Sequence, residues 1–558
     1  MLKKSVKLTF IFIFLQLTTF AQVGYVEVED DIYEFLERMS RLHIIKNYDA
    51  FQIPKTRKEI AKYLKKILNN KDKLHQTDIN KLTDYFMDFE LELTSEMHND
   101  YKLLPDFNLS YILTDKNKFL YQIYDSSGSS IFINFVGELK NINLSKNNKN
   151  KNSLIYKFGG KVRASLYNNF GFYINSTNGS FFGNKELAQN YSSLRYNYKF
   201  HQTSSSNLGN DFFDETSSYL VFENNFMNLK IGNDRNLIGY GKEKFLLSNN
   251  APRMDYLNFN VKYKTLNFTF YHGKLLGSES FSFDSLQGNV NKVVDKYWVY
   301  HRFGLNFSRH FKFGIGEIII YGNRNIDFSY LNPINFYKSA EHANRDRDNS
   351  MLFIDVENNS IYRTRIYSTL LIDDIDFGKL GTGWYGNQIL FTLGANSSIF
   401  YNFFPLDLEL QYTRIDPYVF THRISDNNYT NLNYSLGTTL QPNTSSINLG
   451  FNYYPHYRFS IKGNFKYSVH GNNLYDNQNK LIKNLGGNIL NGHRIGDAEK
   501  VFFLKGDKEY FREYRLTLNY EPIKNWHFVL NLNYFYNLLS NSQHQKEFFT
   551  SFSILTKI

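Results

Sequence analysis

The residues best suited to chemistry gather around one proline, in the stretch LDLELQYTRIDPYVFTHR at positions 406–423. Arg414 and Asp416 carry opposite charges, and Tyr418 and His422 follow within a few positions. Such a set could bind a sugar or transfer a proton. It could equally mark the end of a strand, because proline lacks an N–H and restricts the residue before it to extended conformations. An Arg–Asp contact would then hold that strand end in place.

An acidic group in LLIDDIDFGKLG is the second candidate. Asp373, Asp374 and Asp376 are spaced closely enough to suggest calcium binding or acid–base work on a glycoside. Their spacing lacks the EF-hand pattern, and adjacent residues on a strand point to opposite faces. We therefore expect no metal here and favour a solvated or salt-bridged strand end.

Glu317 is the third candidate, because it interrupts the apolar run IGEIIIYG. With Ile315 and Ile319 in its own strand phase, this carboxylate needs a partner, and a salt bridge to an arginine in a barrel lumen is the simplest one. Tyr321 and Asn332 follow it. The residues that we expect to bind a polysaccharide form two groups: Glu317, Tyr321 and Asn332 at one rim, and Asp373, Asp374, Arg414, Asp416, Tyr418 and His422 at another.

Motifs of known enzymes are missing from the sequence. It has no phosphate-binding loop, no HExxH and no Gly-x-Ser-x-Gly, and its widely spaced histidines have no serine placed with them. It also has no cysteine, which excludes disulfides and thiol chemistry. We expect no enzyme, no cofactor and no nucleic-acid partner.

The N-terminus has the features of an export signal. Lys3, Lys4 and Lys7 precede the apolar stretch Leu8–Leu17, and small residues end at Ala21. This pattern predicts a signal peptide at positions 1–21 that is cleaved after Ala21.

The composition indicates strands that face lipid. Aromatic residues make up 18% of the chain, with 52 Phe and 43 Tyr, while the mean hydropathy is only −0.45. A transmembrane β-barrel combines these properties, because apolar residues facing lipid alternate with polar residues facing the lumen. A large soluble β-sandwich array is the alternative.

From about residue 105 the hydrophobic period is two. Leu257–His272 and Leu516–Tyr536 each predict a hairpin, and Phe548–Ile558 predicts a closing strand. Long polar segments such as Gly471–Lys500 separate other pairs, which is typical of an outer-membrane barrel. In the stretch around the proline, we expect Leu406, Leu408, Leu410 and Tyr412 to face lipid and Asp407, Glu409, Gln411 and Thr413 to face the lumen.

Three amphipathic helices are predicted before the barrel. The first carries Ile32, Phe35 and Leu36 on one face, the second begins at a capping box headed by Thr56, and Thr77 is the predicted cap of the third. We expect a small helical bundle over 22–100 and a barrel over 101–558.

Several stretches resemble the capsule assembly Wzi family in the form found in Bacteroidetes-type bacteria. The similarity rests on LIGYGKEKFLLSNNAPRMDYL, GIGEIIIYG, YLNPINFYKSAEH, LLIDDIDFGKLGTGWYGNQ, YTRIDPYVFTH and LGTTLQPN, and on the helical segment DIYEFLERM…TRKEIAKYL. Gln441 stands where the family often has glycine. Asn141–Ser217 and Gly471–Lys500 match no part of the family pattern.

The resemblance implies an outer-membrane barrel of about 18 strands with a periplasmic helical bundle. It further implies a non-enzymatic lectin that binds and organises capsular or exopolysaccharide at the cell surface. The implied partners are this polysaccharide, outer-membrane lipid and lipopolysaccharide, and other envelope proteins through the bundle. A component of gliding motility or protein secretion, or a diffusion channel, are the alternative functions.

Overall fold

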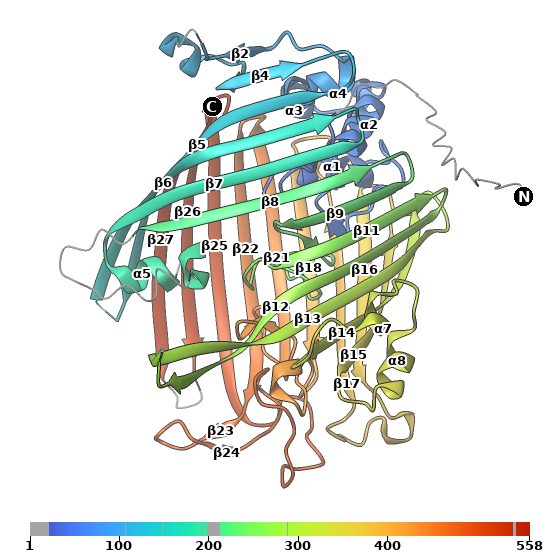
Figure 1. The fold of residues 1–558 in the computed structure, drawn as a ribbon, viewed down its shortest axis with the longest axis vertical. Helices are drawn as coiled ribbons and strands as arrows, with labels where there is room; N and C mark the ends of the chain where they lie inside the picture. Colours follow the sequence, from blue (N-terminus) through green and yellow to red (C-terminus); the bar gives the residue numbers. More distant parts are fainter. Residues whose placement is uncertain are drawn as a thin grey trace, which may run out of the picture.

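The main element of the structure is a closed antiparallel barrel of 18 strands, which confirms the predicted fold class (Figure 1). This computed structural model describes residues 22–105, 108–147, 149–190, 192–197, 212–286, 288–539 and 543–558, so the predicted signal peptide lies outside the described residues. In order around the wall, the strands are β5 (Ser130–Lys146), β6 (Lys149–Leu166), β7 (Phe170–Gly183), β8 (Phe213–Glu223), β9 (Met227–Asn233), β11 (Asp255–Tyr263), β12 (Leu266–Asp284), β13 (Gly288–Asn306), β14 (Phe311–Gly322), β15 (Asn349–Asn358), β16 (Thr364–Asp374), β17 (Gln388–Ser397), β18 (Leu406–Ile415), β21 (Thr444–His456), β22 (Phe459–Asn472), β25 (Asp507–Ile523), β26 (Trp526–Leu538) and β27 (His544–Lys557).

The barrel closes between its last strand and its first long strand. In β27, Glu547 to Lys557 pair with Lys146 to Val136 of β5, and the short strand β4 (Tyr121–Tyr124) extends the same edge of β5. Closure leaves the sheet without a free edge along this seam, as a wall in contact with lipid requires. The predicted closing strand is therefore confirmed.

Both predicted hairpins are present. Tyr263 of β11 pairs with Leu266 of β12, and Ile523 of β25 pairs with Trp526 of β26. These tight turns belong to one end of the barrel, which we call the short-turn end. The opposite end, drawn at the bottom of Figure 1, carries the long connections and is called the long-loop end.

The alternation predicted for β18 is also observed. Gln411 and Thr413 are buried in the lumen, whereas Leu410 on the opposite face is 49% exposed. The same phase around the wall exposes large apolar side chains on the outside, among them Leu220, Ile231, Leu393, Ile447, Leu449, Phe451 and Phe548. The outer surface thus has the apolar wall of a membrane barrel.

Within residues 22–105, four helices precede the barrel: α1 (Ile32–Arg41), α2 (Arg57–Leu68), α3 (Gln76–Asp88) and α4 (Glu90–Thr94). Thr56 caps α2 by accepting a hydrogen bond from the backbone N–H of Glu59, at 3.2 Å, as predicted. The prediction that Thr77 caps the third helix is wrong. The cap is His75, whose ring Nδ1 accepts from the N–H of Thr77 at 3.2 Å, because the helix begins two residues earlier.

A buried ion network ties these helices to the barrel wall. Arg38 of α1 donates to both carboxylate oxygens of Asp78 in α3, and its third nitrogen contacts Asp407 of β18 at 2.9 Å. Arg41 contacts the other oxygen of Asp407 at 2.7 Å. The charges of the two arginines and the two carboxylates balance. These contacts hold the N-terminal segment inside the short-turn end of the barrel (Figure 1).

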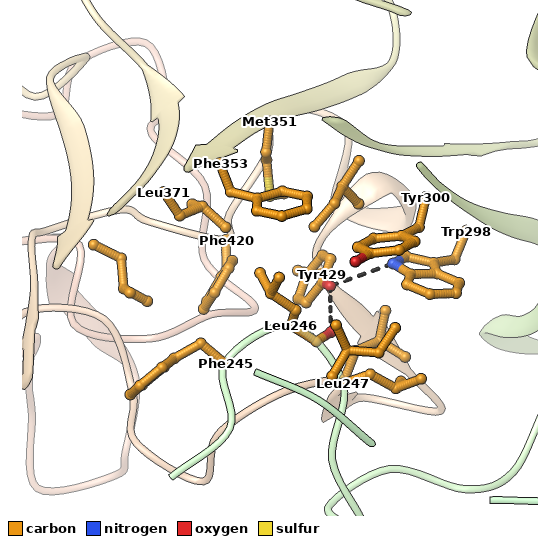
Figure 2. Close-up of a cluster of buried hydrophobic side chains, with 14 of the residues drawn as sticks. Phe245, Leu246, Leu247, Trp298, Tyr300, Met351, Phe353, Leu371, Phe420 and Tyr429 are labelled. Carbon is orange, nitrogen blue, oxygen red and sulfur yellow. Dashed lines mark hydrogen bonds between the residues drawn. The ribbon is translucent and has the colours of Figure 1, made fainter. Parts of the chain in front are cut away.

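A second segment, residues 234–254 between β9 and β11, also enters the lumen. Its short strand β10 (Leu237–Ile238) pairs with β1 (Gln52–Ile53) of the N-terminal segment. Phe245, Leu246 and Leu247 then join a buried core with side chains from the wall and from residues 416–443 (Figure 2). In this core, the Tyr429 hydroxyl donates to the backbone carbonyl of Leu246 at 2.5 Å. Packed side chains therefore fill the lumen beside β11 to β18.

The remaining elements of the described ranges lie in the connections. They are β2 (Asp100–Lys102), β3 (Asn117–Phe119), α5 (Lys185–Asn190), α7 (Phe328–Leu331), α8 (Tyr337–Ala343), β19 (Thr430–Asn431), β20 (Tyr434–Ser435), β23 (Leu474–Tyr475), β24 (Leu481–Lys483) and five single 3-10 turns, η1 to η5, at Lys71–Lys73, Leu109–Leu113, Ser193–Tyr196, Phe377–Lys379 and Ser425–Asn427. None of the helices in the described ranges has the length and apolar character needed to cross a membrane.

The Arg38–Asp407 network predicts how the N-terminal segment can be loosened. Asp407→Asn leaves two arginines without a full counter-charge, so we expect a destabilisation of about 3 kcal/mol. Trypsin should then release the N-terminal segment faster, and the barrel should unfold at lower temperature in a heat-modifiability gel. Glu34→Gln is the control, because Glu34 and its partner Lys462 are 30% and 25% exposed, and it should cost less than about 1 kcal/mol. Equal behaviour of the two variants would contradict the role of the network.

Candidate functional site

The long-loop end is closed by connections that pack on one another. Tyr418 from residues 416–443 is fully buried against Leu485 and Val501 of the connection between β22 and β25. The Tyr418 backbone N–H donates to Gly486 at 3.0 Å, and its hydroxyl donates to the Asn484 carbonyl at 3.2 Å. Tyr418 is thus an anchor between two loops.

The Arg–Asp contact proposed from the sequence is present. Arg414 donates to Asp416 at 2.8 Å, and its guanidinium lies 4.1 Å from the ring centre of Phe503. The Arg414 side chain is 46% exposed on the outside of the wall, because the strand alternation continues to Ile415, which is buried. The pair therefore fixes the rim where β18 ends.

Asp373 holds the turn that follows. Its carboxylate accepts a hydrogen bond from the backbone N–H of Phe420 at 2.6 Å. Both Tyr418 and Phe420 have positive φ, at 65° and 70°, which is uncommon for such bulky residues. A buried acceptor aimed at this backbone is a physical reason for the conformation. Asp374, the next residue, is exposed.

His422 lies at the far end of the same turn. Its backbone N–H donates to the Asn428 side chain at 2.7 Å, and its ring Nδ1 contacts the backbone of Ile424. The fold thus brings Asp373, Arg414, Asp416, Tyr418 and His422 together around one chain reversal.

Glu317 belongs to a separate group on the outside of the wall. Ile318 and Ile320 of β14 pack in the lumen core, so Glu317 in the alternate phase points outward. There it accepts from the backbone N–H of Tyr337 at 2.9 Å, and it lies 3.2 Å from the ring of His301. The expected salt bridge to an arginine in the lumen is therefore wrong.

Helices α7 and α8 pack over this outward group through Tyr330 and Tyr337, and Figure 1 draws them beside β14 and β15. Tyr321 is buried between them and the wall, where its hydroxyl contacts the ring of His272 at 2.8 Å. Asn332 lies in the connection between the helices and is exposed, and its side-chain oxygen accepts from the N–H of Ile334 at 3.3 Å. The connection between β14 and β15 thus folds back over the barrel exterior.

The predicted residues therefore form two separate groups, one on the outer face of β14 beneath α7 and α8 and one around the end of β18. Glu317, Tyr321, Asp373 and Tyr418 are buried and hold loops in place. Among the described candidates, Asn332, Asp374 and Arg414 are exposed.

A polar cavity of about 480 Å³ lies at the long-loop end, and sequence reasoning missed it. Its walls come from β22, β25 and the connections 433–444 and 487–490, with exposed Asn433, Thr439 and Leu490 at its border. Side chains lining it are Gln441, Thr444, Lys466, Ser468, His470, Asn472, Asn488, Glu509, Phe511 and Glu513. The alternation of β22 and β25 marked some of them as lumen-facing, but the sequence did not indicate that they share one cavity.

His470 connects the wall of this cavity to its roof. Its Nδ1 lies 3.0 Å from the carboxylate of Glu509, which is directly opposite on β25, and its Nε2 lies 2.8 Å from the carbonyl of Gly487. A carbonyl accepts only, so Nε2 donates to it. The contact with Glu509 then needs one further proton shared between the ring and the carboxylate.

Lys466 carries the positive charge on the cavity floor. Its ammonium lies 3.0 Å from Glu243 of the lumen segment and 3.3 Å from Glu513. Burial raises the pKa of Glu243, but the attraction of Lys466 and the hydrogen bond from Thr438 outweigh this and hold the pKa below its ordinary value of 4.5. The floor is therefore charged at neutral pH.

Gln441, the departure from the family pattern, has a structural role here. Its side-chain oxygen accepts from the backbone N–H of Ile489 at 3.1 Å and joins two walls of the cavity.

A second feature that sequence reasoning missed is the loop after β16. There the ring of Tyr385 stacks on His493 with centroids 3.5 Å apart, and Lys379 lies 4.0 Å from the ring centre of Trp384. The sequence GWYG could have indicated these aromatic side chains.

The comparisons with known proteins support the fold. No protein-family model matches the sequence, and a search of curated proteins finds no match. The structure of Wzi, an outer-membrane protein involved in group 1 capsule assembly in Escherichia coli and a carbohydrate-binding β-barrel, is similar with a TM-score of 0.54. The two sequences are 12% identical over 95% of this chain and 99% of Wzi. OccAB2 of Acinetobacter baumannii (TM-score 0.44, 10% identity, 76% and 98% covered) and OprD of Pseudomonas aeruginosa (0.40, 8%, 76% and 95%) are less similar. The chain thus has the fold of outer-membrane barrels, in an arrangement like that of Wzi.

The lowered pKa of Glu243 predicts a pH-dependent stability. The ionised carboxylate is favoured in the folded state, so its contribution is full above the ordinary value of 4.5 and is lost as the pH falls through the lower folded pKa. We expect Glu243→Gln to cost about 2 kcal/mol at pH 7, with the difference from the wild type shrinking below pH of about 4.5. Thermal unfolding in detergent at several pH values measures this difference. A gap that widens in acid would contradict the assignment.

The His470 contacts predict a local effect. In His470→Gln the side chain cannot serve both Glu509 and Gly487, so the roof of the cavity should open more often. We expect amide hydrogen exchange in residues 484–489 to become about tenfold faster, as for the loss of one charge-assisted hydrogen bond. His544→Gln, which alters an exposed contact with Tyr536, is the control and should leave that exchange unchanged.

Proposed function

We propose that this chain is an outer-membrane barrel of the capsule assembly Wzi type that binds and organises capsular or extracellular polysaccharide without catalysis. In this proposal the long-loop end faces the exterior and the helical segment 22–100 faces the periplasm, since outer-membrane barrels have long outer loops and short periplasmic turns. The signal peptide expected at positions 1–21 fits export to that membrane.

The cavity beside His470 is the observation that carries the proposal. It combines carboxylates and amides that bind hydroxyl groups with the ring of Phe511, against which the C–H face of a sugar can pack. Lys466 is paired with Glu243 and Glu513, so the cavity suits a neutral sugar better than an acidic one. This mixture is expected of a carbohydrate site. We propose that exposed Asn332, Asp374 and Arg414, together with His422, extend contact along the polymer, and that the buried candidates support the loops.

The packed core in the lumen narrows the path that a diffusion channel would need. The N-terminal segment and residues 234–254 meet inside the barrel. The core around Leu246 and Tyr429 joins residues 234–254 to the wall and to residues 416–443 (Figure 2). A solute that passes beside β11 to β18 would have to displace this core. Beside β5 to β8, the lumen holds a cavity of about 570 Å³ lined mainly by polar and charged side chains. A role in gliding motility or protein secretion is compatible with the same fold, and an experiment separates it from polysaccharide binding.

Cells lacking the gene test the proposal. We expect them to shed surface polysaccharide into the medium and to regain it when complemented with the wild-type gene, as measured by fractionating cell-bound and released polysaccharide. If the polysaccharide stays attached while spreading on a surface fails, the motility alternative is correct and the lectin proposal is wrong.

Binding by the purified protein locates the site. Phe511→Ala removes the apolar face of the cavity, so we expect at least fivefold weaker binding to immobilised polysaccharide extracted from the source bacterium, a loss within the range for one aromatic contact. Phe459→Ala is the matched control, because Phe459 begins the same β22 wall at the short-turn end, and it should bind like the wild type. Equal binding by both variants would place the polysaccharide elsewhere.

A further inference from the structure

The outer wall carries a row of alternating aromatic and cationic side chains near the long-loop end. Tyr467 of β22 is directly opposite Arg512 of β25, Arg512 is opposite Tyr536 of β26, and Tyr536 is opposite Lys546 of β27. These four residues, which we call the cation row, lie in the phase of the sheet that faces outward, as does the exposed Tyr514.

Both cations are held on tyrosine rings. The Arg512 guanidinium lies 5.3 Å from the ring centre of Tyr536 and 5.8 Å from that of Tyr467, and the Lys546 ammonium lies 5.8 Å from the ring centre of Tyr536. Within the part of the chain that the structure describes, neither cation forms a salt bridge. Charge on a lipid-facing wall is costly unless it lies near the interface or meets an opposite charge. The row thus presents two cations that the barrel itself does not neutralise.

An apolar groove of about 790 Å³ lies directly beside the cation row, toward the middle of the barrel. The groove residues nearest to the cation row lie two positions further along the same strands. They are Phe465, Tyr514, Tyr534 and Phe548, each directly opposite the next on the neighbouring strand. Small residues at Ala395 and Gly463 leave space among the large side chains. Two residues along a strand span about 7 Å, so the cations and the groove are within reach of a single amphiphilic molecule.

We propose that this surface binds a phosphate-bearing membrane lipid, with its anionic headgroup on Arg512 and Lys546 and an acyl chain in the groove. The charge complementarity selects this occupant, because the groove supplies almost no polar group of its own and the only strong polar attraction is for an anion. A second copy of the chain would have to bring an acidic patch to the cation row. The site is independent of polysaccharide binding, since none of its residues lines the cavity beside His470.

Native mass spectrometry of the full, delipidated chain in detergent tests the proposal. Diphosphoryl lipid A and dimyristoyl phosphatidylcholine, offered at equal concentration, are the probes. We expect the wild type to retain lipid A at least tenfold better than phosphatidylcholine, and Arg512→Gln combined with Lys546→Gln to lose that preference. Ala395→Phe, which fills the groove and changes no charge, should weaken retention of both lipids.

Controls separate the headgroup from general charge and from folding. Lys264→Gln removes a cation that lies 5.2 Å from a tyrosine ring at the short-turn end, and it should retain lipid A like the wild type. Inorganic phosphate at millimolar concentration should not displace the lipid, because the acyl chain contributes to binding. The proposal is overturned if the double variant keeps the preference for lipid A or if phosphate alone displaces lipid A from the wild type. It is also overturned if the wild type is a dimer and the double variant is a monomer.

Discussion

Closure of the barrel is the constraint on which the rest of the structure depends. A lipid-facing sheet has no water to satisfy its backbone, so each strand needs two neighbours, and β27 supplies the last of them by pairing with β5. A closed wall of 18 strands encloses more space than the side chains of the wall alone can fill. The N-terminal segment and residues 234–254 occupy part of that space, and they meet as a two-stranded sheet inside it.

Two kinds of interaction hold the inserted segments in the lumen, and they lie at different positions along the barrel axis. Near the short-turn end, buried ion pairs such as Arg38–Asp407 attach the helices to the wall. Further along, an apolar core joins the inserted segment to the loops of the opposite end, with the Tyr429 hydroxyl bonded to a backbone carbonyl (Figure 2). The ion pairs fix the position of the helices against the wall, and the apolar core removes large side chains from water. The loops at the long-loop end pack on this core.

The outside of the wall also carries polar and charged side chains at two places on its apolar surface. Helix α8 covers a buried Glu317–His301 pair on one part of it, and the cation row borders an apolar groove on another. Both arise where the outward phase of a strand carries a polar residue that cannot be left alone in lipid. In one case the chain supplies its own cover, and in the other we infer that a lipid does so.

The sequence alone determined the strands, their alternation and their turns. The hydrophobic period of two and the residue types of the turns are local properties, so they can be recognised without tertiary information. It therefore predicted the Leu257–His272 hairpin, the closing strand and the Arg414–Asp416 contact, which joins residues two positions apart. Only the tertiary structure decided which face Glu317 occupies, that His470 meets Gly487, and that residues 234–254 pack inside the lumen. These features depend on long connections folding back onto the wall, and their contacts join residues whose separation in sequence carries no periodic signal.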